Sequence, residues 1–272
     1  MLRGMATLDD LILEIENALD GEEYEEALEL AQAGLERHPQ SAWLHGFVGE
    51  SLAGLGEMEA ACEAYERAAR IEPGAPEFAE ALADAYLRSA RFDDARTAAE
   101  RGLAADAQAA GALDILAYVA ERAGDIRAAD DFLARARAAD PESRGPCRLG
   151  EADFRSVVKE ALETLPDDFQ RALEKNLAII VEPIPTTAFL GSSEPPLDPT
   201  ILGVYSGVPL PDREPSQSPP PLPDTIHLFQ RNLEHICGSR DELVDEIATT
   251  LYHEVAHYFG FEEDEMEGMG LE

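Results

Sequence analysis

The chain has few basic residues: 21 Lys and Arg stand against 56 Asp and Glu among 272 residues, which gives a formal net charge of −35. Phosphate backbones and anionic lipid headgroups bind proteins mainly through basic patches. We therefore expect neither nucleic acid nor a membrane surface as a partner. The excess of acid is typical of a solvated surface that keeps a protein soluble, and the alternative is an acidic site for a basic ligand.

Cysteine is equally scarce. Cys62, Cys147 and Cys237 are odd in number, lie far apart and form no CxxC pair, so neither a disulfide framework nor a thiolate zinc site is indicated. The chain also lacks an apolar run of bilayer-spanning length, and its first residues turn acidic within ten positions. We expect no signal peptide, no transmembrane helix and a cytoplasmic location.

A period of 34 residues runs through the first half of the chain. Small residues keep this spacing at Ala27, Ala61, Ala95 and Ala129. Three positions before each of them stands an apolar residue: Tyr24, Met58, Phe92 and Ile126. Twelve positions after them stand Pro39, Pro73 and Pro141, with Ala107 in the place of the third proline. A small residue permits a close helix crossing, and a proline follows a helix that it cannot continue. The pattern predicts helix pairs, with Gly56 and Gly124 at turns inside the pairs.

This pattern resembles the tetratricopeptide repeat (TPR), with units near 8–41, 42–75, 76–109 and 110–143. Gly49 and Tyr86 stand where that family has glycine and tyrosine, whereas its tryptophan and Leu-Gly are mostly absent. An ordinary helical bundle is the alternative, but four coincident registers favour a repeat stack. The resemblance implies an α-helical solenoid whose concave surface binds a protein partner. The repeats could instead stabilise the second half of the chain or join it into an oligomer.

The 34-residue rhythm ends after Pro141, in the Gly- and Pro-containing stretch PESRGPCRLGE. We place a boundary near residue 150, which gives domains at 1–150 and 151–272. Beyond it, amphipathic patterns predict a helix from about Phe154 to Leu165 and another over LPDDFQRALEKN.

Strand patterns follow these helices. The apolar, β-branched run LAIIVE (177–182) predicts a buried strand. Residues 183–224 are crowded with proline, which predicts a long surface loop, with a strand over 201–210 inside it. A further strand is expected over 224–233. The last two could form a hairpin or be neighbouring strands at a sheet edge, where an extended peptide could pair with the main chain.

The last predicted helix has a clear start. Ser239 and Glu242 have the spacing of a capping box. An apolar stripe follows: Leu243, Val244, Ile247, Leu251 and Val255.

The candidate chemistry lies in HEVAH at 253–257. His253 and His257 are four apart, so on a helix both imidazoles project from one face and can bind one zinc ion, while Glu254 can act as general base on a metal-bound water. Chance would give such a match only about 0.03 times in a chain of this composition, which favours a functional site. The alternatives are two histidines satisfied by hydrogen bonds at a helix end, and a site that binds metal without catalysis.

A catalytic zinc normally has three protein ligands and an open position. Because the sequence stops at Glu272, we expect no distant glutamate and look for a local ligand in H-E-x-x-H-x-x-G-x-x-acid. Gly260 would let the backbone leave the helix sharply, and Glu263 would return to the metal. Asp264 stays open as the alternative, since residues 262–265 read EEDE.

From about Phe154 to Leu271 the chain resembles the minimal zincin-like metallopeptidases, through a GVYSGVPL-type strand, LPDTIHLFQRNLEHICGSRDEL and TLYHEVAHYFGFEEDEMEGMG in this order. The resemblance implies a compact α+β zincin fold, Zn²⁺ as cofactor, and a site made of His253, Glu254, His257 and Glu263. Family members often have Asp as third ligand, so Glu263 departs from the pattern.

Together these features predict a multidomain protein of the α and α+β classes, a TPR solenoid followed by a small zincin-like domain. The expected function is a zinc-dependent metallopeptidase that acts on a protein or peptide substrate. The alternative is a non-catalytic TPR adaptor whose zincin-like domain binds metal for structure only. The intact Glu254 favours the enzyme, because a structural zinc site has no use for a general base.

Overall fold

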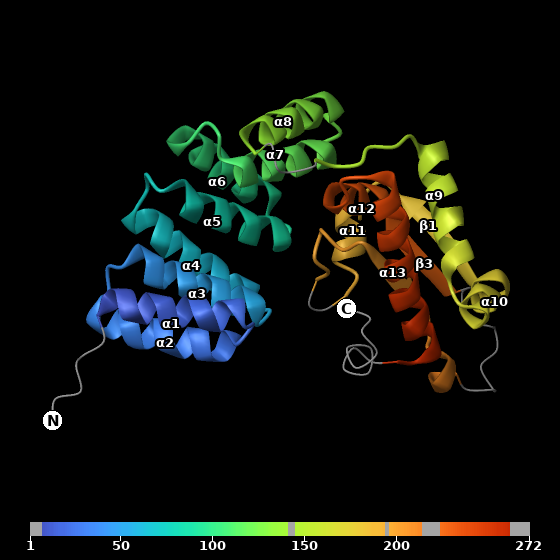
Figure 1. The fold of residues 1–272 in the computed structure, drawn as a ribbon, viewed down its shortest axis with the longest axis horizontal. Coiled ribbons are helices and arrows are strands. Elements are labelled where there is room, and N and C mark those ends of the chain that lie inside the picture. The colour runs from blue at the N-terminus through green and yellow to red at the C-terminus, as the bar shows by residue number, and fades with distance from the viewer. Residues whose placement is uncertain (1–6, 141–144, 194–195, 214–223, 262–272) are drawn as a thin grey trace. The chain divides into compact units, whose positions relative to one another are not determined.

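The computed structural model describes residues 7–140, 145–193, 196–213 and 224–261 (Figure 1). Contacts within the chain divide it into two units, Met1–Pro141 and Glu142–Glu272. Each unit has hydrophobic clusters of its own. None of the described helices combines the length and the low charge that a membrane-spanning segment requires.

The described part of the first unit is built from helix pairs (Figure 1). The pairs are α1 (Leu8–Asp20) with α2 (Tyr24–Arg37), α3 (Ala42–Gly54) with α4 (Met58–Ile71), α5 (Pro76–Arg88) with α6 (Phe92–Ala105), and α7 (Ala110–Arg122) with α8 (Ile126–Ala139). First helices begin at 8, 42, 76 and 110, and second helices at 24, 58, 92 and 126, so both sets keep the 34-residue step. The predicted repeat stack is confirmed.

Small residues allow the helices of this stack to cross closely. The four alanines at the repeated position, Ala27, Ala61, Ala95 and Ala129, are fully buried. Gly49 acts in the same way, because a Cβ atom there would lie only 2.8 Å from the Tyr65 ring. Contacts of α1 with α3, α3 with α5, and α5 with α7 place the first helices side by side. We call the surface that they form the first-helix face.

Each turn inside a pair contains one residue with left-handed backbone, again in steps of 34: Glu22, Gly56, Ala90 and Gly124, with φ of 58°, 77°, 56° and 77°. The hydrogen bonds are those of a Schellman helix end; in the third turn, Arg91 N–H donates to Tyr86 O at 2.8 Å. The predicted glycine turns are confirmed. In the other two turns the left-handed residue is Glu22 or Ala90, not glycine, and these turns were not predicted.

The second unit packs a small sheet and several helices around one long helix. Its elements are α9 (Glu151–Thr164), α10 (Asp167–Asn176), β1 (Leu177–Glu182), α11 (Thr187–Leu190), β2 (Gly203–Ser206), the 3₁₀ helix η1 (Leu210–Asp212), β3 (Asp224–Phe229), α12 (Gln230–Ile236) and α13 (Arg240–Phe259). The strand order is β1-β3-β2, with β1 parallel and β2 antiparallel to β3. The helices expected after the boundary are confirmed as α9 and α10.

The strands depart from the sequence prediction in three ways. β1 has the predicted range but is only partly buried, because it lies at an edge of the described sheet: Leu177 is buried, whereas Ile180 is 43% exposed. β2 is shorter than the expected 201–210, since Pro209 and Pro211 lead into η1, and Pro cannot donate to a sheet. β3 ends at Phe229, where α12 begins. Phe229 and Leu233 are four apart and fully buried, a helical spacing that the strand prediction overlooked.

Helix α13 was predicted well at both ends. Ser239 Oγ accepts the Glu242 N–H at 3.2 Å, although the Glu242 carboxylate accepts from Gly238 N–H (2.9 Å) instead of from Ser239 N–H. The apolar stripe of Leu243, Val244, Ile247, Leu251 and Val255 is buried. At the other end Gly260 is left-handed, with φ of 89°, and Phe261 N–H donates to Ala256 O at 3.1 Å. Gly260 therefore ends the helix as expected.

Candidate metal centre

Two imidazoles converge near the end of α13. His253 Nε2 lies 3.1 Å from His257 Nε2, and the two rings are nearly perpendicular, at 84°. Both side chains are only partly buried. The spacing of four residues on one helix places the rings one above the other, which is why two residues close in sequence share one site.

The pair fits a single zinc ion. With Zn–N bonds of about 2.0–2.1 Å and tetrahedral angles, two ligand nitrogens lie about 3.3 Å apart. The observed 3.1 Å between the Nε2 atoms is close to this separation. His257 Nδ1 lies 3.3 Å from Phe261 O. A backbone carbonyl in this position accepts a hydrogen bond from Nδ1–H, which keeps the proton on Nδ1 and leaves the Nε2 lone pair available for a metal.

Glu254 is held from the neighbouring strand. Its side chain is 7% exposed, and its Oε2 accepts the Tyr205 backbone N–H at 2.6 Å. A backbone N–H bound to a carboxylate forms a short, charge-assisted hydrogen bond that fixes the orientation of the carboxylate. The sequence contained no sign of this contact, because Tyr205 and Glu254 are 49 positions apart.

A cavity of about 220 Å³ opens beside these groups. Gly203 of β2 lines it from one side, and Glu246, Thr250, His253 and Glu254 of α13 line it from the other. Burial raises the pKa of Glu246 above its usual range. The cavity gives a ligand access to the general-base candidate and to one of the two imidazoles.

A clamp that was not predicted lies beside the end of α13. Asp224, which is 5% exposed, accepts from Arg213 Nη2 at 2.6 Å and from Tyr205 Oη at 2.9 Å. The Arg213 guanidinium also lies 5.1 Å from the centre of the Tyr258 ring. Burial and the bond to Asp224 raise the pKa of Tyr205, so its hydroxyl stays protonated and can donate. The clamp joins β2, through Tyr205, and β3, through Asp224, to Arg213, which follows η1. Arg213 in turn contacts Tyr258 of α13, the helix that carries the histidines.

The third ligand expected at Glu263, and its alternative Asp264, lie outside the described residues. Within the described ranges, no group of three or more His, Cys, Asp or Glu side chains is placed to hold a metal ion. The structure therefore brings together His253 and His257, with Glu254 beside them, as a two-imidazole site.

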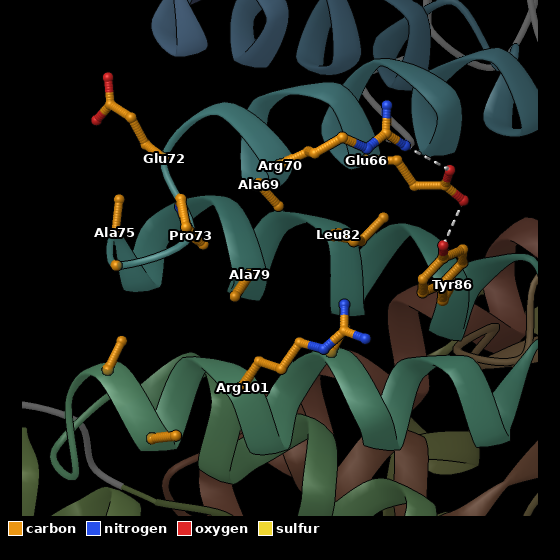
Figure 2. A pocket seen from close by; sticks show the side chains of 14 residues that line it. Glu66, Ala69, Arg70, Glu72, Pro73, Ala75, Ala79, Leu82, Tyr86 and Arg101 are labelled. Carbon is orange, nitrogen blue, oxygen red and sulfur yellow. Dashed lines mark hydrogen bonds and ion pairs between the residues drawn. The ribbon is translucent and has the colours of Figure 1, made fainter.

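A second cavity, of about 720 Å³, lies in the first unit between α4, α5 and α6 (Figure 2). Its walls are rich in alanine, and its charged residues are two acids, Glu66 and Glu72, and two bases, Arg70 and Arg101. Glu66 accepts from Tyr86 Oη at 2.5 Å and lies 4.0 Å from Arg70. Arg101 also projects into the cavity (Figure 2). Nothing in this lining pairs a nucleophile with a base.

Known proteins resemble the two halves of the chain separately. A family model described as zincin-like metallopeptidase matches residues 174–271, and a tetratricopeptide repeat model matches 13–76. No curated protein matches the chain significantly.

Solved structures match about half of this chain. A crystal structure of MamA is 18% identical, covering 50% of this chain and 80% of MamA with a TM-score of 0.46. TTC0263, a thermophilic TPR protein in Thermus thermophilus, is 19% identical; the match covers 49% of this chain and 74% of TTC0263, with a TM-score of 0.45. MamA 41-end from Desulfovibrio magneticus RS-1 is 14% identical; the match covers 50% of this chain and 76% of the MamA chain, with a TM-score of 0.45. By the family models, the chain carries tetratricopeptide repeats in its first half and a zincin-like metallopeptidase domain in its second.

Proposed function

We propose that this protein is a zinc-dependent metallopeptidase with a TPR protein-interaction module. The observation that carries the proposal is the convergence of His253 Nε2 and His257 Nε2 at 3.1 Å, with Glu254 beside them at the wall of an open cavity. The proposed domains are 1–150 for the repeats and 151–272 for the peptidase. The three cysteines of the described chain are free thiols, which supports a reducing, cytoplasmic location.

When bound, a zinc ion supplies Lewis acidity and makes a bound water acidic near neutral pH. The Nε2 atoms of His253 and His257 would hold the ion. Glu254 would take the proton of the attacking water on its carboxylate and pass it to the departing amine nitrogen as the peptide bond breaks. The Tyr205 N–H, at 2.6 Å, keeps the carboxylate oriented for both transfers.

The substrate would lie along β2. In the described sheet this strand pairs only with β3, so its other edge is available to an extended peptide except at the Tyr205 N–H, which donates to Glu254. The same strand bonds to Glu254, which would place the paired peptide next to the general base. Main-chain pairing sets no side-chain preference by itself.

We propose Glu263 as the third metal ligand, with Asp264 as the alternative. The left-handed Gly260 supports this, because it turns the chain back at the end of the helix that carries both histidines. Glu263→Gln should weaken zinc binding, measured by competition with a chromophoric chelator, more than Asp264→Asn does. The reverse order would move the ligand to Asp264.

The adaptor alternative is favoured by one observation: the Glu254 carboxylate is buried and bonded to the main chain, which a structural role would also explain. Under this reading the repeats bind a protein partner, and the zincin-like domain binds metal only for stability. Glu254→Gln would then leave metal binding and partner binding unchanged and alter only the stability of the domain.

The decisive experiment combines metal analysis with cleavage of a peptide library. We expect about one zinc per wild-type chain and loss of metal in His253→Ala, with His38→Ala in the repeat unit as the matched control. Glu254→Gln should keep the metal and lose cleavage by about a hundredfold or more, because only the base is removed. Asp245→Asn, an exposed position on the same helix, should keep both.

The outcomes separate the readings. Zinc without cleavage in the wild type would favour the adaptor, and absence of metal would remove the site assignment. Cleavage that survives in Glu254→Gln would exclude Glu254 as the base.

A further inference from the structure

An aromatic cavity lies on the first-helix face of the first unit. It has a volume of about 310 Å³ and is lined by residues of α3 and α5 and by Tyr65 of α4. Trp43 lines it and is 46% exposed, which is unusual for the largest apolar side chain. Tryptophan buries a large area when a partner covers it, so an exposed one beside a cavity is a candidate contact.

The cavity walls are rigid and aromatic. The Trp43 ring lies 5.2 Å from the Phe78 ring in an edge-on arrangement (70°) and 6.3 Å from the Phe47 ring. Phe47 and Phe78 are themselves buried, so the repeat core holds them in place. Gly46 lets the Phe78 ring approach α3 closely, because a Cβ atom there would lie 3.1 Å from that ring.

Carboxylates surround the aromatic walls. Glu50 of α3 and Glu77 and Asp84 of α5 line the cavity, and no Lys or Arg is among its described lining residues. The side-chain carboxylates of Glu50 and Glu77 make no hydrogen bond or ion pair within the described ranges. The Glu50 side chain is still solvent-accessible, but partial desolvation and the nearby Asp20 charge raise its pKa. An added positive charge would relieve this unfavourable environment.

We propose that this cavity binds a lysine or arginine side chain of a basic segment in a protein partner. The Trp43 face would hold the cation by a cation–π contact, and Glu50 and Glu77 would form ion pairs with it. Charge complementarity identifies the occupant, since the chain carries a net charge of −35 and the cavity lining contributes the Glu50 and Glu77 carboxylates. The inference deepens the proposed partner-binding role of the repeats and is independent of the metal centre.

The cavity of Figure 2 differs because its lining contains both acidic and basic residues. There Glu66 is bonded to Tyr86 and close to Arg70, so acid and base are already balanced inside the lining. The aromatic cavity has acidic groups alone.

Trp43 is the only tryptophan in the chain, so its fluorescence reports on this cavity directly. The probes are three synthetic octapeptides in which glycine alternates with Arg and Lys, with Gln, or with Glu. They are titrated into the full chain at low salt, with and without a chelator, to separate the result from metal binding and cleavage. We expect a saturable change in Trp43 emission with the basic peptide, and a Kd about tenfold weaker or more for the Gln peptide.

The variant Glu50→Gln/Glu77→Gln keeps the fluorophore and should weaken binding of the basic peptide about tenfold. The matched control, Glu25→Gln/Glu29→Gln, removes two exposed carboxylates of α2 and should change the Kd less than about twofold. Circular dichroism melting confirms that both variants fold.

Four results would overturn the proposal. These are equal affinity for the acidic peptide, no response to any peptide, unchanged affinity in Glu50→Gln/Glu77→Gln, or an emission change that depends on protein concentration alone. The last would assign the face to a second copy of the chain.

Discussion

Two of the four turns in the repeat unit place a residue with a Cβ atom in left-handed backbone. Ala90 and Glu22 have φ of 56° and 58°, whereas Gly56 and Gly124 occupy the equivalent positions without steric cost. For an L-residue this conformation costs roughly 1–2 kcal/mol. The repeat geometry, fixed by helix packing on both sides, outweighs this local preference.

Ala90→Gly should therefore stabilise the protein by about 0.5–1 kcal/mol, and Gly56→Ala should destabilise it by a similar amount. No atom lies within 4 Å of a Cβ built at Gly56, so the effect there comes from the backbone alone. Urea unfolding followed by circular dichroism measures both changes. If Ala90→Gly is destabilising, the greater freedom of glycine in the unfolded chain outweighs the relief of strain.

At the scale of elements, the approach of β2 to α13 determines the site. A Cβ atom on Gly203 would lie 2.7 Å from Thr250 Cγ2 and 3.1 Å from His227 O. This close contact lets the Tyr205 N–H reach the Glu254 carboxylate on the same helix. The glycine thus acts through packing, without touching the histidines.

Gly203→Ala should destabilise the second unit by about 1–3 kcal/mol, because the added methyl overpacks the strand against the helix. Thr250→Ser removes the Cγ2 atom that the methyl would meet, and the double variant Gly203→Ala/Thr250→Ser should recover part of the loss. Thermal unfolding of the four proteins forms a double-mutant cycle. Additive effects would show that Thr250 does not set the limit on this approach.

At the scale of the whole molecule, charge is the dominant feature. With −35 formal charges, like-charge repulsion opposes the folded state more than the expanded one. The ion pairs at Arg67, Arg155 and Arg171 have both partners more than half exposed, and such pairs contribute little. Repulsion should therefore dominate the response to ionic strength.

Raising NaCl from about 0.01 M to 0.15 M shortens the screening length from about 30 Å to about 8 Å. The Tm should rise by several degrees, measured by differential scanning calorimetry. Choline chloride at equal ionic strength is the control, since it excludes specific binding of sodium. A Tm that falls with salt would mean that ion pairs outweigh the repulsion.

Local patterns accounted for much of this protein. The 34-residue period predicted the start of the helix pairs, because a buried alanine, an apolar residue and a proline recur wherever two helices cross and end. HEVAH on a helix brought His253 and His257 together, since residues four apart share a face. Gly260 ended that helix because it tolerates left-handed backbone.

The sequence alone thus determined the repeat architecture, which its 34-residue period shows, and the last helix with the pairing of its histidines, which depend on neighbours within one or two helical turns. Only the tertiary structure decided which edge of the sheet β1 and β2 occupy, that Tyr205 holds Glu254, and that Trp43 and Phe78 share an acidic cavity. The Trp43–Phe78 contact joins residues 35 positions apart, and the Tyr205–Glu254 contact joins residues 49 positions apart. Their partners are chosen by packing of the folded chain, for which a single sequence contains no periodic signal.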